Sequence, residues 1–381
     1  MKVSRRGEVP AFIVMDVMKA AEERKVAGGD VLHMEVGQPS TGAPAGVVAA
    51  AKRALDDGIL GYTLALGIEP LRQCIAAHYR TEYGVEVSPE RIVATTGSSG
   101  AFLLSFLAAF DPGDKVAILR PGYPCYRNIL KTLQIEPVDI PVGPETRFQP
   151  TMDALERAGG ADLDGLLLAS PANPTGSMLE DHELEALLGY CRDNGIRYIS
   201  DEIYHGITFE RRAQTALAYD PDAVVINSFS KYFSMTGWRL GWMVLPEELL
   251  RPVERLAQNL FISPPSLSQH AAVAAFQCRE ELEANVARYR RNRDVLLERL
   301  PQAGFSRLSP ADGAFYLYAD VSGLTNDSRA FCEAMLRETG IAATPGHDFD
   351  PVDGAAAMRF SFAGGTADME LAAERLKDWL T

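Results

Sequence analysis

The chain repeats one order of local signals: a short apolar strand, a glycine or proline turn, and then a helix. Strands are predicted at residues 91–95, 115–119, 166–169, 198–200, 223–228 and 241–245 of the 381 residues. A turn at 97–100 is expected to precede a buried helix at 101–110, and another helix is expected at 183–194. This alternation is typical of an α/β fold, in which helices flank a mostly parallel sheet.

The sequence changes character near residue 280. A long charged helix is predicted at 280–300, followed by strands at 315–320 and 358–362 and helices at 329–339 and 368–380. Residues 31–36 resemble a strand that has no partner nearby in the sequence. We therefore expect a large domain over 45–280, and a smaller α+β domain formed by 1–44 together with 281–381.

The acidic balance of the chain argues against several classes of partner. Its 37 basic and 51 acidic residues give a net charge of −14, which repels nucleic acid and anionic lipid. No apolar run reaches the ~18 residues of a membrane span, and no signal-peptide pattern follows the basic N-terminus, so we expect a cytoplasmic protein. The five scattered cysteines show no CxxC spacing, which argues against disulfides and a metal site.

Polar side chains follow several predicted strands at the points where the strands end. These are Ser98 and Ser99 after the first strand, Asn173 after the third, Asp201 after the fourth, and Ser228 and Lys231 after the fifth. In parallel sheets, ligands bind just beyond the carboxyl ends of the strands. We therefore expect one ligand site that is built from all of these segments.

Lys231 is the main candidate for covalent chemistry. It ends the segment Ser228-Phe229-Ser230-Lys231, and Arg239 follows after a glycine-containing turn. This set suits an aldehyde that carries a phosphate, because the amine forms an imine while hydroxyls and the guanidinium hold the phosphate. The turn Thr96-Gly97-Ser98-Ser99-Gly100 opens a helix and predicts a further anion site, with a simple helix cap as the alternative.

Two other segments have both a functional and a structural interpretation. Prolines on both sides of Asn173 restrict the backbone of this loop and so fix the direction of the Asn173 amide, which could donate to an anionic oxygen. The alternative is a turn in which the Asn173 side chain caps its own backbone. Asp201 directly follows an apolar strand and needs a partner such as a protonated ring nitrogen, with Tyr204 reaching the same ligand. The alternative is an aspartate helix cap beside a packed tyrosine.

Six motifs occur along the chain in this order: Gly37-Gln38-Pro39, Pro121-Gly122-Tyr123-Pro124, Asn173-Pro174-Thr175-Gly176, Ser200-Asp201-Glu202-Ile203-Tyr204, Ser228-Phe229-Ser230-Lys231 and Met235-Thr236-Gly237-Trp238-Arg239. From Gly37 to Arg359 the chain resembles the class I/II aminotransferases of pyridoxal-phosphate fold type I, the aspartate aminotransferase superfamily. The resemblance implies pyridoxal 5′-phosphate as cofactor and a homodimer with shared active sites. It also implies ping-pong transfer of an amino group between an L-amino acid and a 2-oxo acid, through aldimine, quinonoid and ketimine intermediates.

The resemblance further implies roles for the residues around the cofactor ring. Lys231 would form the imine and shuttle the proton, and Asp201 would keep the ring nitrogen protonated, so that the ring acts as an electron sink. Asn173 and Tyr204 would bind the phenolate oxygen of the ring, while Tyr123 would stack on its face.

The same resemblance implies a phosphate site and a carboxylate site. The phosphate would be held by Ser98, Ser99, Ser228, Arg239 and, from a second subunit, Tyr62. Arg359 would clamp the substrate carboxylate together with Asn173 and the backbone of Gly37. For Arg359 the alternative is an ordinary surface charge on a strand.

The substrate and two competing functions remain open from the sequence. Aspartate-specific relatives place an arginine before a segment comparable to residues 261–265, where this chain has Gln258. This argues against a strong dicarboxylate preference through that arginine, and we expect aromatic or neutral aliphatic amino acids at least as much as dicarboxylates. A helix at 12–27 is a candidate lid. The competing functions are a pyridoxal-phosphate-dependent carbon–sulfur β-lyase and a non-catalytic effector-binding module.

Overall fold

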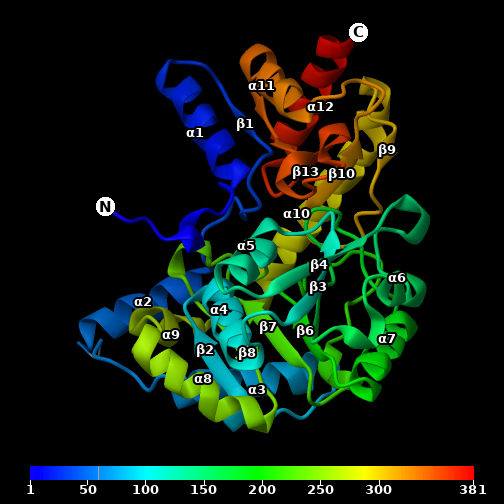
Figure 1. Cartoon of the computed structure of the whole chain (residues 1–381). Coiled ribbons are helices and arrows are strands. Elements are labelled where there is room, and N and C mark those ends of the chain that lie inside the picture. Colours follow the sequence, from blue (N-terminus) through cyan, green and yellow to red (C-terminus); the bar gives the residue numbers. More distant parts are fainter. Residues whose placement is uncertain (59) are drawn as a thin grey trace.

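The computed structural model describes residues 1–58 and 60–381, and its largest element in these residues is a seven-stranded sheet of order β2-β8-β7-β6-β5-β3-β4 (Figure 1). Neighbouring strands are parallel except at β8, which is antiparallel to both β2 and β7. The strands are β2 (Ile92–Thr95), β3 (Lys115–Arg120), β4 (Glu136–Pro141), β5 (Gly165–Ala169), β6 (Arg197–Asp201), β7 (Val224–Ser228) and β8 (Gly241–Val244). The predicted α/β fold with a mostly parallel sheet is confirmed.

The register of the sheet brings the predicted polar segments to one edge. Asp201 is the last residue of β6 and lies level with Ala169, the last residue of β5. Ser228 ends β7 opposite Gly241, which also lies opposite Thr95 at the end of β2. Because these strands end at the same level, the loops that follow them share one edge of the sheet.

Helices cover both faces of this sheet because alternate strand residues point to opposite sides. Leu166 and Leu168 pack on one face and Leu167 on the other. The first face is covered by α2 (Ala45–Asp56), α3 (Glu69–Tyr83), α6 (Met152–Arg157), α7 (Asp181–Asp193) and α9 (Ser266–Ala272). The second face is covered by α4 (Gly97–Ala109), α5 (Pro124–Thr132) and α8 (Glu247–Leu260).

One predicted boundary is wrong. The sequence predicts a turn at 97–100 before a helix at 101–110, whereas α4 already begins at Gly97. The φ angle of Gly97 is +73°, which glycine adopts without strain, so the chain leaves β2 and enters the helix with no separate turn. Ser98 and Ser99 consequently lie in the first helical turn.

A smaller lobe lies above the large sheet in Figure 1. Its strands are β1 (Leu32–His33), β9 (Arg307–Leu308), β10 (Tyr316–Asp320), β11 (Ile341–Ala342), β12 (Thr344–Pro345) and β13 (Ala357–Ser361). Its helices are α1 (Ile13–Val26), α10 (Arg279–Arg299), α11 (Ser328–Thr339) and α12 (Thr366–Leu380). Strand β1 pairs in parallel with β11, so the N-terminal strand finds its partner near the C-terminus.

Helix α10 connects the two lobes without a break. Leu282, in its first turn, belongs to the core of the large sheet, whereas Val286, Tyr289 and Leu296 belong to the core of the small lobe. A domain boundary at residue 280 stays a prediction, since the helix contributes to both cores.

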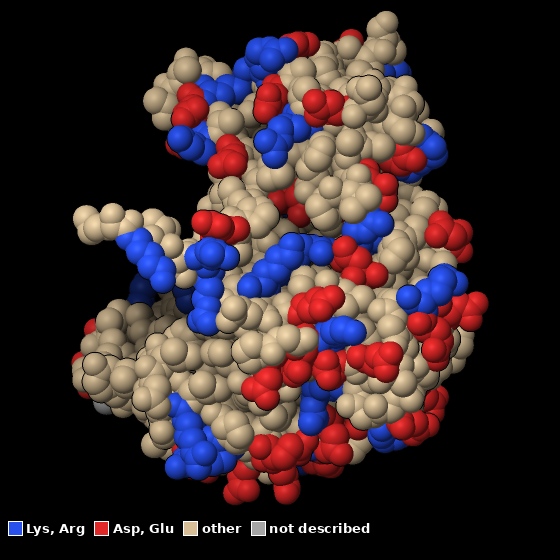
Figure 2. Space-filling view, in the orientation of Figure 1, with Lys and Arg blue, Asp and Glu red and all other residues tan. Residues whose placement is uncertain are grey.

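The visible surface is mixed in charge. Figure 2 shows Lys and Arg side chains crossing the waist between the lobes, while Asp and Glu side chains gather over the lower lobe. Among the described helices, none is both long enough and apolar enough to cross a lipid bilayer.

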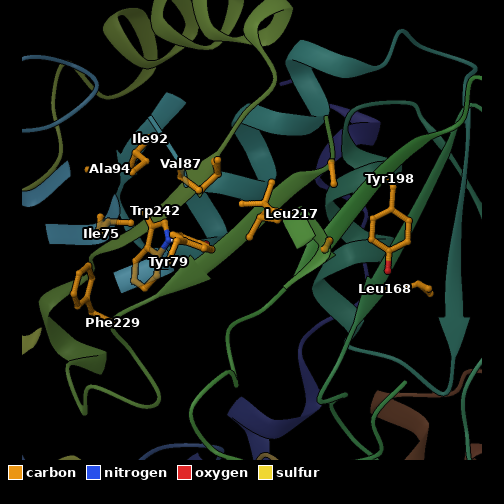
Figure 3. Packing of buried hydrophobic residues seen from close by; sticks show 14 of the residues in the cluster. Ile75, Tyr79, Val87, Ile92, Ala94, Leu168, Tyr198, Leu217, Phe229 and Trp242 are labelled. Carbon is orange, nitrogen blue, oxygen red and sulfur yellow. The ribbon is translucent and has the colours of Figure 1, made fainter. Parts of the chain in front are cut away.

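Trp242 on β8 anchors the first face of the sheet. Figure 3 shows its indole beside Tyr79 and Phe229, and the indole Nε1–H donates to the Tyr79 hydroxyl at 3.2 Å. The rings of Trp242 and Phe229 have centroids 4.9 Å apart, and both residues are fully buried. This cluster holds the end of β7, and therefore the segment that carries Lys231, against the helices.

Replacing Trp242 with alanine is expected to destabilise the protein by ~3–5 kcal/mol, because a buried indole is lost and a cavity remains. The measurement is equilibrium denaturation by urea, compared with Leu55→Ala on α2, whose side chain is 55% exposed. The control is expected to change stability by less than ~0.5 kcal/mol. Equal effects of the two substitutions would contradict this account of the core.

Candidate active site

A cavity of about 200 Å³ opens at the edge of the sheet where β2, β5, β6 and β7 end. Most of the residues predicted from the sequence line it together: Gly37, Ser98, Ser99, Tyr123, Asn173, Asp201, Tyr204, Lys231, Arg239 and Arg359. They come from both lobes, because Gly37 and Arg359 belong to the small-lobe segments and the others to the large lobe.

Lys231 projects into this cavity from the loop after β7. Its Nζ donates to the carbonyl oxygen of Gly37 at 2.5 Å and lies 5.9 Å from the centre of the Tyr204 ring. Burial, followed by the like charges of Arg359 and Arg239, lowers the pKa of Lys231 to about 8. A substantial fraction of this amine is therefore neutral near physiological pH, as a nucleophile or a base must be.

Asp201 is a buried carboxylate on the floor of the cavity, 3% exposed. It accepts hydrogen bonds from the backbone N–H of Ile203 at 3.0 Å and from the Tyr126 hydroxyl. Burial raises the pKa of Asp201 to about 6, although the bond from Tyr126 opposes that shift. In the described part of the chain Asp201 forms no ion pair, so a cationic group in the cavity would stabilise its ionised form.

One end of the cavity is built to hold an anion. Ser98 and Ser99 lie in the first turn of the 13-residue helix α4, where free backbone N–H groups and the helix dipole favour negative charge. The Arg239 guanidinium lies against this turn, so closely that a Cβ on Gly97 would come within 2.6 Å of its Nη2. A Cβ on Gly241 would also meet the backbone N of Ser98 at 3.0 Å. Both glycines therefore shape the anion site.

Arg359 closes the opposite end and is itself only 3% exposed. Its Nη1 donates to Asn173 Oδ1 at 2.8 Å, and its Nη2 donates to the backbone carbonyl of Glu35. Its guanidinium carbon lies 4.3 Å from the centre of the Tyr316 ring. Across residues 1–58 and 60–381, no carboxylate lies within ion-pair distance of Arg359, which is unusual for a buried cation.

The chain is similar to known proteins over most of its length. A model of the family described as "Aminotransferase class I and II" matches residues 29–376, which is most of the chain.

The chain belongs to the class I and II aminotransferases.

The relatives agree with this membership. Valine–pyruvate aminotransferase of Mycobacterium tuberculosis is 51% identical, over 100% of this chain and 98% of that protein. Aspartate/prephenate aminotransferase of Thermus thermophilus is 33% identical, over 98% and 97%. The crystal structure of an aminotransferase from M. tuberculosis superposes with a TM-score of 0.97 at 51% identity, over 100% and 99% of the two chains. That of Thermus thermophilus aspartate aminotransferase with maleate superposes at 0.93 with 31% identity, over 99% of each.

These similarities show that the chain is an aminotransferase enzyme with the fold of aspartate aminotransferases. Membership of this family implies pyridoxal phosphate as the cofactor. The fold and enzyme class expected from the six motifs are thus confirmed.

Two residues predicted for the site lie outside the cavity of this aminotransferase protomer. The hydroxyl of Ser228 donates to Ser230 Oγ at 2.9 Å, or to the Leu240 carbonyl at 3.1 Å, behind the cavity wall, and Ser230 lines the wall instead. Tyr62 is 87% exposed on the surface, as a residue must be if it serves a neighbouring subunit. Their roles toward the phosphate stay predictions.

Sequence reasoning missed two tyrosines that hold the functional groups. Tyr126 lies in the first turn of α5, three residues after Tyr123, which precedes the helix as its N-cap. This i, i+3 spacing was the available signal. Tyr316 shares a hydrogen bond with the Tyr204 hydroxyl at 2.6 Å. A Cβ on Gly37 would overlap the Tyr316 hydroxyl, so this position requires glycine.

The N-terminal segment closes one side of the cavity. Phe12, Val14 and Met15 line it, and the Phe12 ring meets the edge of Tyr123 at a centroid distance of 5.9 Å. The helix predicted at 12–27 is present as α1, and its first backbone N–H, of Ile13, donates to Asp348 Oδ1 at 2.9 Å. Opening of this segment as a lid stays a prediction.

Tyr126→Phe is expected to raise the pKa of Asp201 further above about 6, because the hydroxyl that stabilises the carboxylate is lost. One hydrogen bond to a charged group corresponds to a shift of about one to two pH units. The measurement is a carbon-13 NMR titration of aspartate-labelled protein without cofactor. Tyr123→Phe serves as the matched control, and a control shift as large as that of Tyr126→Phe would contradict the assignment.

Proposed function

We propose that pyridoxal 5′-phosphate binds in this cavity and that the enzyme transfers an amino group between a neutral L-amino acid and a 2-oxo acid. The observation that carries the proposal is a set of three charged groups that line the cavity without ion-pair partners among the described residues. Asp201 and Arg359 are each 3% exposed, and Lys231 is partly buried. A phosphorylated pyridine aldehyde together with an amino acid supplies a complementary group for each of them.

The cavity fits the cofactor group by group. Ser98, Ser99 and Arg239 surround the anion site for the phosphate, while Asp201 lies where a protonated ring nitrogen would be neutralised. Tyr123 presents its ring on the cavity wall for stacking. When bound, pyridoxal phosphate supplies an electron-poor ring that accepts the electron pair released at the substrate α-carbon.

Asn173 and Tyr204 are suited to the ring oxygen. The amide oxygen of Asn173 accepts from Arg359, which leaves its NH₂ group to donate, and Tyr204 brings a hydroxyl that Tyr316 orients. Burial raises the pKa of Tyr204 well above its usual value, so its hydroxyl keeps its proton and is a donor.

Lys231 moves the proton in this scheme. With a pKa of about 8, a neutral amine is present in roughly one molecule in ten at pH 7, and this form would be the nucleophile toward an aldehyde. With cofactor and substrate bound, the neutral Nζ would be the group that takes the proton from the substrate α-carbon. The carbonyl of Gly37, 2.5 Å away, orients the amine.

Arg359 positions the substrate. Its guanidinium forms the bidentate geometry that a carboxylate prefers, with Asn173 and the Glu35 carbonyl holding the guanidinium plane. Fixing the carboxylate sets which bond at the α-carbon stands perpendicular to the ring, and a perpendicular C–H bond leads to amino transfer.

The remaining cavity wall favours a neutral side chain. Phe12, Val14, Met15 and Ile203 supply apolar surface. The lining cations of this protomer are Lys231, Arg239 and Arg359, each with a role already, and Gln258 lies on the exposed face of α8. The relative that is 51% identical is named for valine and pyruvate, which agrees with this choice.

Single amino acids mixed with the holoenzyme, in the absence of an acceptor, test the substrate class. Valine or alanine is expected to convert the cofactor to its amine form, seen as loss of the visible absorption band. Aspartate is expected to have a kcat/KM at least about 100-fold lower, since an unpaired buried carboxylate costs ~3 kcal/mol or more. A preference for aspartate would overturn the substrate proposal, and steady release of pyruvate and ammonia would indicate the β-lyase.

The matched variants for this experiment are Lys231→Ala and Lys115→Ala. Lys115 is exposed at the start of β3, far from the cavity lining, and its variant is expected to react normally. Lys231→Ala is expected to retain the phosphate site but to fail in the conversion.

We also propose a homodimer in which each subunit completes the site of the other. Tyr62, Leu64, Leu260 and Ile262 are between 50% and 87% exposed, which makes an apolar surface. Their two segments are joined, because the Ser266 hydroxyl donates to the Gly61 carbonyl at 2.5 Å. Such a surface is expected to be covered by a symmetric partner.

Mixing Lys231→Ala protein with Tyr62→Ala protein tests the shared site. Each variant alone is expected to be strongly impaired, whereas exchange of subunits pairs a native Lys231 with a native Tyr62 in one site of each mixed dimer. Random exchange restores about a quarter of the native sites. A mixture with only the sum of the separate activities, or a particle of 41.5 kDa in sedimentation, would contradict the proposal.

A further inference from the structure

A second cavity, of about 320 Å³, lies on the other side of the loops that carry the active site. It is enclosed by α3, by the first half of α10, by residues 205–213 and by Tyr232 and Phe233. It is larger than the active-site cavity and falls within the volume range of small-molecule sites. None of the roles assigned above involves it.

The inner end of this second cavity combines aromatic rings with two unused polar groups. His78 is packed edge-on against Phe233 and Trp242, with ring centroids 6.3 and 6.4 Å away, and burial lowers the pKa of His78 to about 4. The neutral imidazole therefore keeps one donor and one acceptor, and neither is used by a residue that the structure describes.

Asn227 adds a directed donor. It is 5% exposed, and its Oδ1 accepts the backbone N–H of Ser228 at 2.7 Å, which fixes the orientation of the amide. In the part of the chain with described coordinates, the Nδ2 of Asn227 has no hydrogen-bond partner, although the residue lines the cavity. The residue is largely buried, but its Nδ2 is accessible from the cavity, so a ligand that carries an acceptor can use this donor.

The mouth of the second cavity is charged with both signs. Arginines outnumber glutamates at this mouth, whereas acidic residues outnumber basic residues in the whole chain. The arginines are Arg211, Arg212, Arg279 and Arg290, and the glutamates are Glu82, Glu210 and Glu283. Several of them pair across the opening, Arg279 with Glu82 at 2.8 Å and Arg290 with Glu210 at 3.6 Å. Such pairs at a solvent-exposed rim exchange readily with an incoming ligand.

We infer that this second cavity binds a free α-amino acid with a planar ring, distinct from the substrate in the active site. The ring enters among the aromatic side chains and meets Asn227 and His78, as rings prefer edge-to-face contacts with a polar group in reach. The zwitterionic head remains at the mouth, with its carboxylate on the arginines and its ammonium on a glutamate.

Two pairs of sequence neighbours connect the second cavity to the active site. Tyr204 and Lys231 line the active site, while the residues that follow them, His205 and Tyr232, line the second cavity. The ring of Tyr232 lies so close to Gly206 that a Cβ there would come within 2.5 Å of Cδ2. The two cavities therefore share the wall that is formed by Tyr204, His205, Lys231 and Tyr232.

The test uses L-tryptophan and calorimetry on holoenzyme that carries Arg359→Gln, which removes the carboxylate site of the active-site cavity. Tryptophan is expected to bind this protein with a stoichiometry of one per chain. Adding His78→Phe, which keeps the aromatic packing and removes both ring nitrogens, is expected to weaken binding about tenfold. Adding His182→Phe, at an exposed position on α7, is the matched control and is expected to change nothing.

A crystal of the unaltered holoenzyme soaked in tryptophan gives an independent answer, which does not depend on any variant or on the reaction. Density for the indole between α3 and α10 supports the inference. The inference would be overturned if density appeared only in the active site or at neither place. It would also be overturned if the protein bound tryptophan equally well with and without His78→Phe. None of these results depends on which substrate the enzyme prefers, so the proposed function stands or fails separately.

Discussion

The charges of Asp201 and Arg359, which are buried, and of Lys231, which is partly buried, have no ion-pair partners among the described residues, and this is the constraint around which the structure is organised. An uncompensated buried charge lowers the free energy of unfolding by on the order of 3–5 kcal/mol. Packing elsewhere in the protein must therefore stabilise the fold by at least this amount. The pKa of Lys231 is lowered and that of Asp201 is raised, and both shifts move the groups toward neutrality. The extensive apolar cores on both faces of the sheet keep these groups from relaxing into water.

The site exists only where the two lobes meet. Arg359 lies on β13 and Gly37 follows β1, both in the small lobe, whereas Asp201 and Lys231 follow strands of the large sheet. Tyr204 belongs to the large lobe by sequence but packs into the core of the small lobe. Correct docking of the lobes and correct assembly of the charges are therefore the same event, and a loosely docked lobe would leave Arg359 too far away to bind a carboxylate.

The sequence predicted the parts of the structure that depend on local order. Alternating strands and turns gave the sheet, and the parallel direction of its strands placed Ser98, Asn173, Asp201 and Lys231 at one edge. The start of α4 was misjudged, because a glycine with positive φ normally signals a turn, and here it opens a helix directly. The presence of glycine in the sequence does not reveal whether a turn or a helix follows the strand.

Contacts made by distant segments could not be predicted in this way. The hydroxyl of Tyr126 reaches Asp201 across 75 positions, and Tyr316 reaches Tyr204 across 112. Tyr316 stands in no pattern that differs from an ordinary buried aromatic residue, and the i, i+3 spacing of Tyr123 and Tyr126 does not indicate which carboxylate Tyr126 reaches. Their roles follow from how helix α5 and strand β10 are placed in space, which no spacing along the chain encodes.

Helix α10 has a mechanical consequence. It runs for 21 residues, about 30 Å, through the cores of both lobes, and a continuous helix of this kind bends little. The first turn of α10 contributes Leu282 to the core of the large sheet, and Glu283 beside it lines the second cavity. A tilt of the small lobe relative to the large sheet would therefore have to rotate α10 about this first turn. The walls of the second cavity and the packing of the small lobe are therefore joined by one continuous helix.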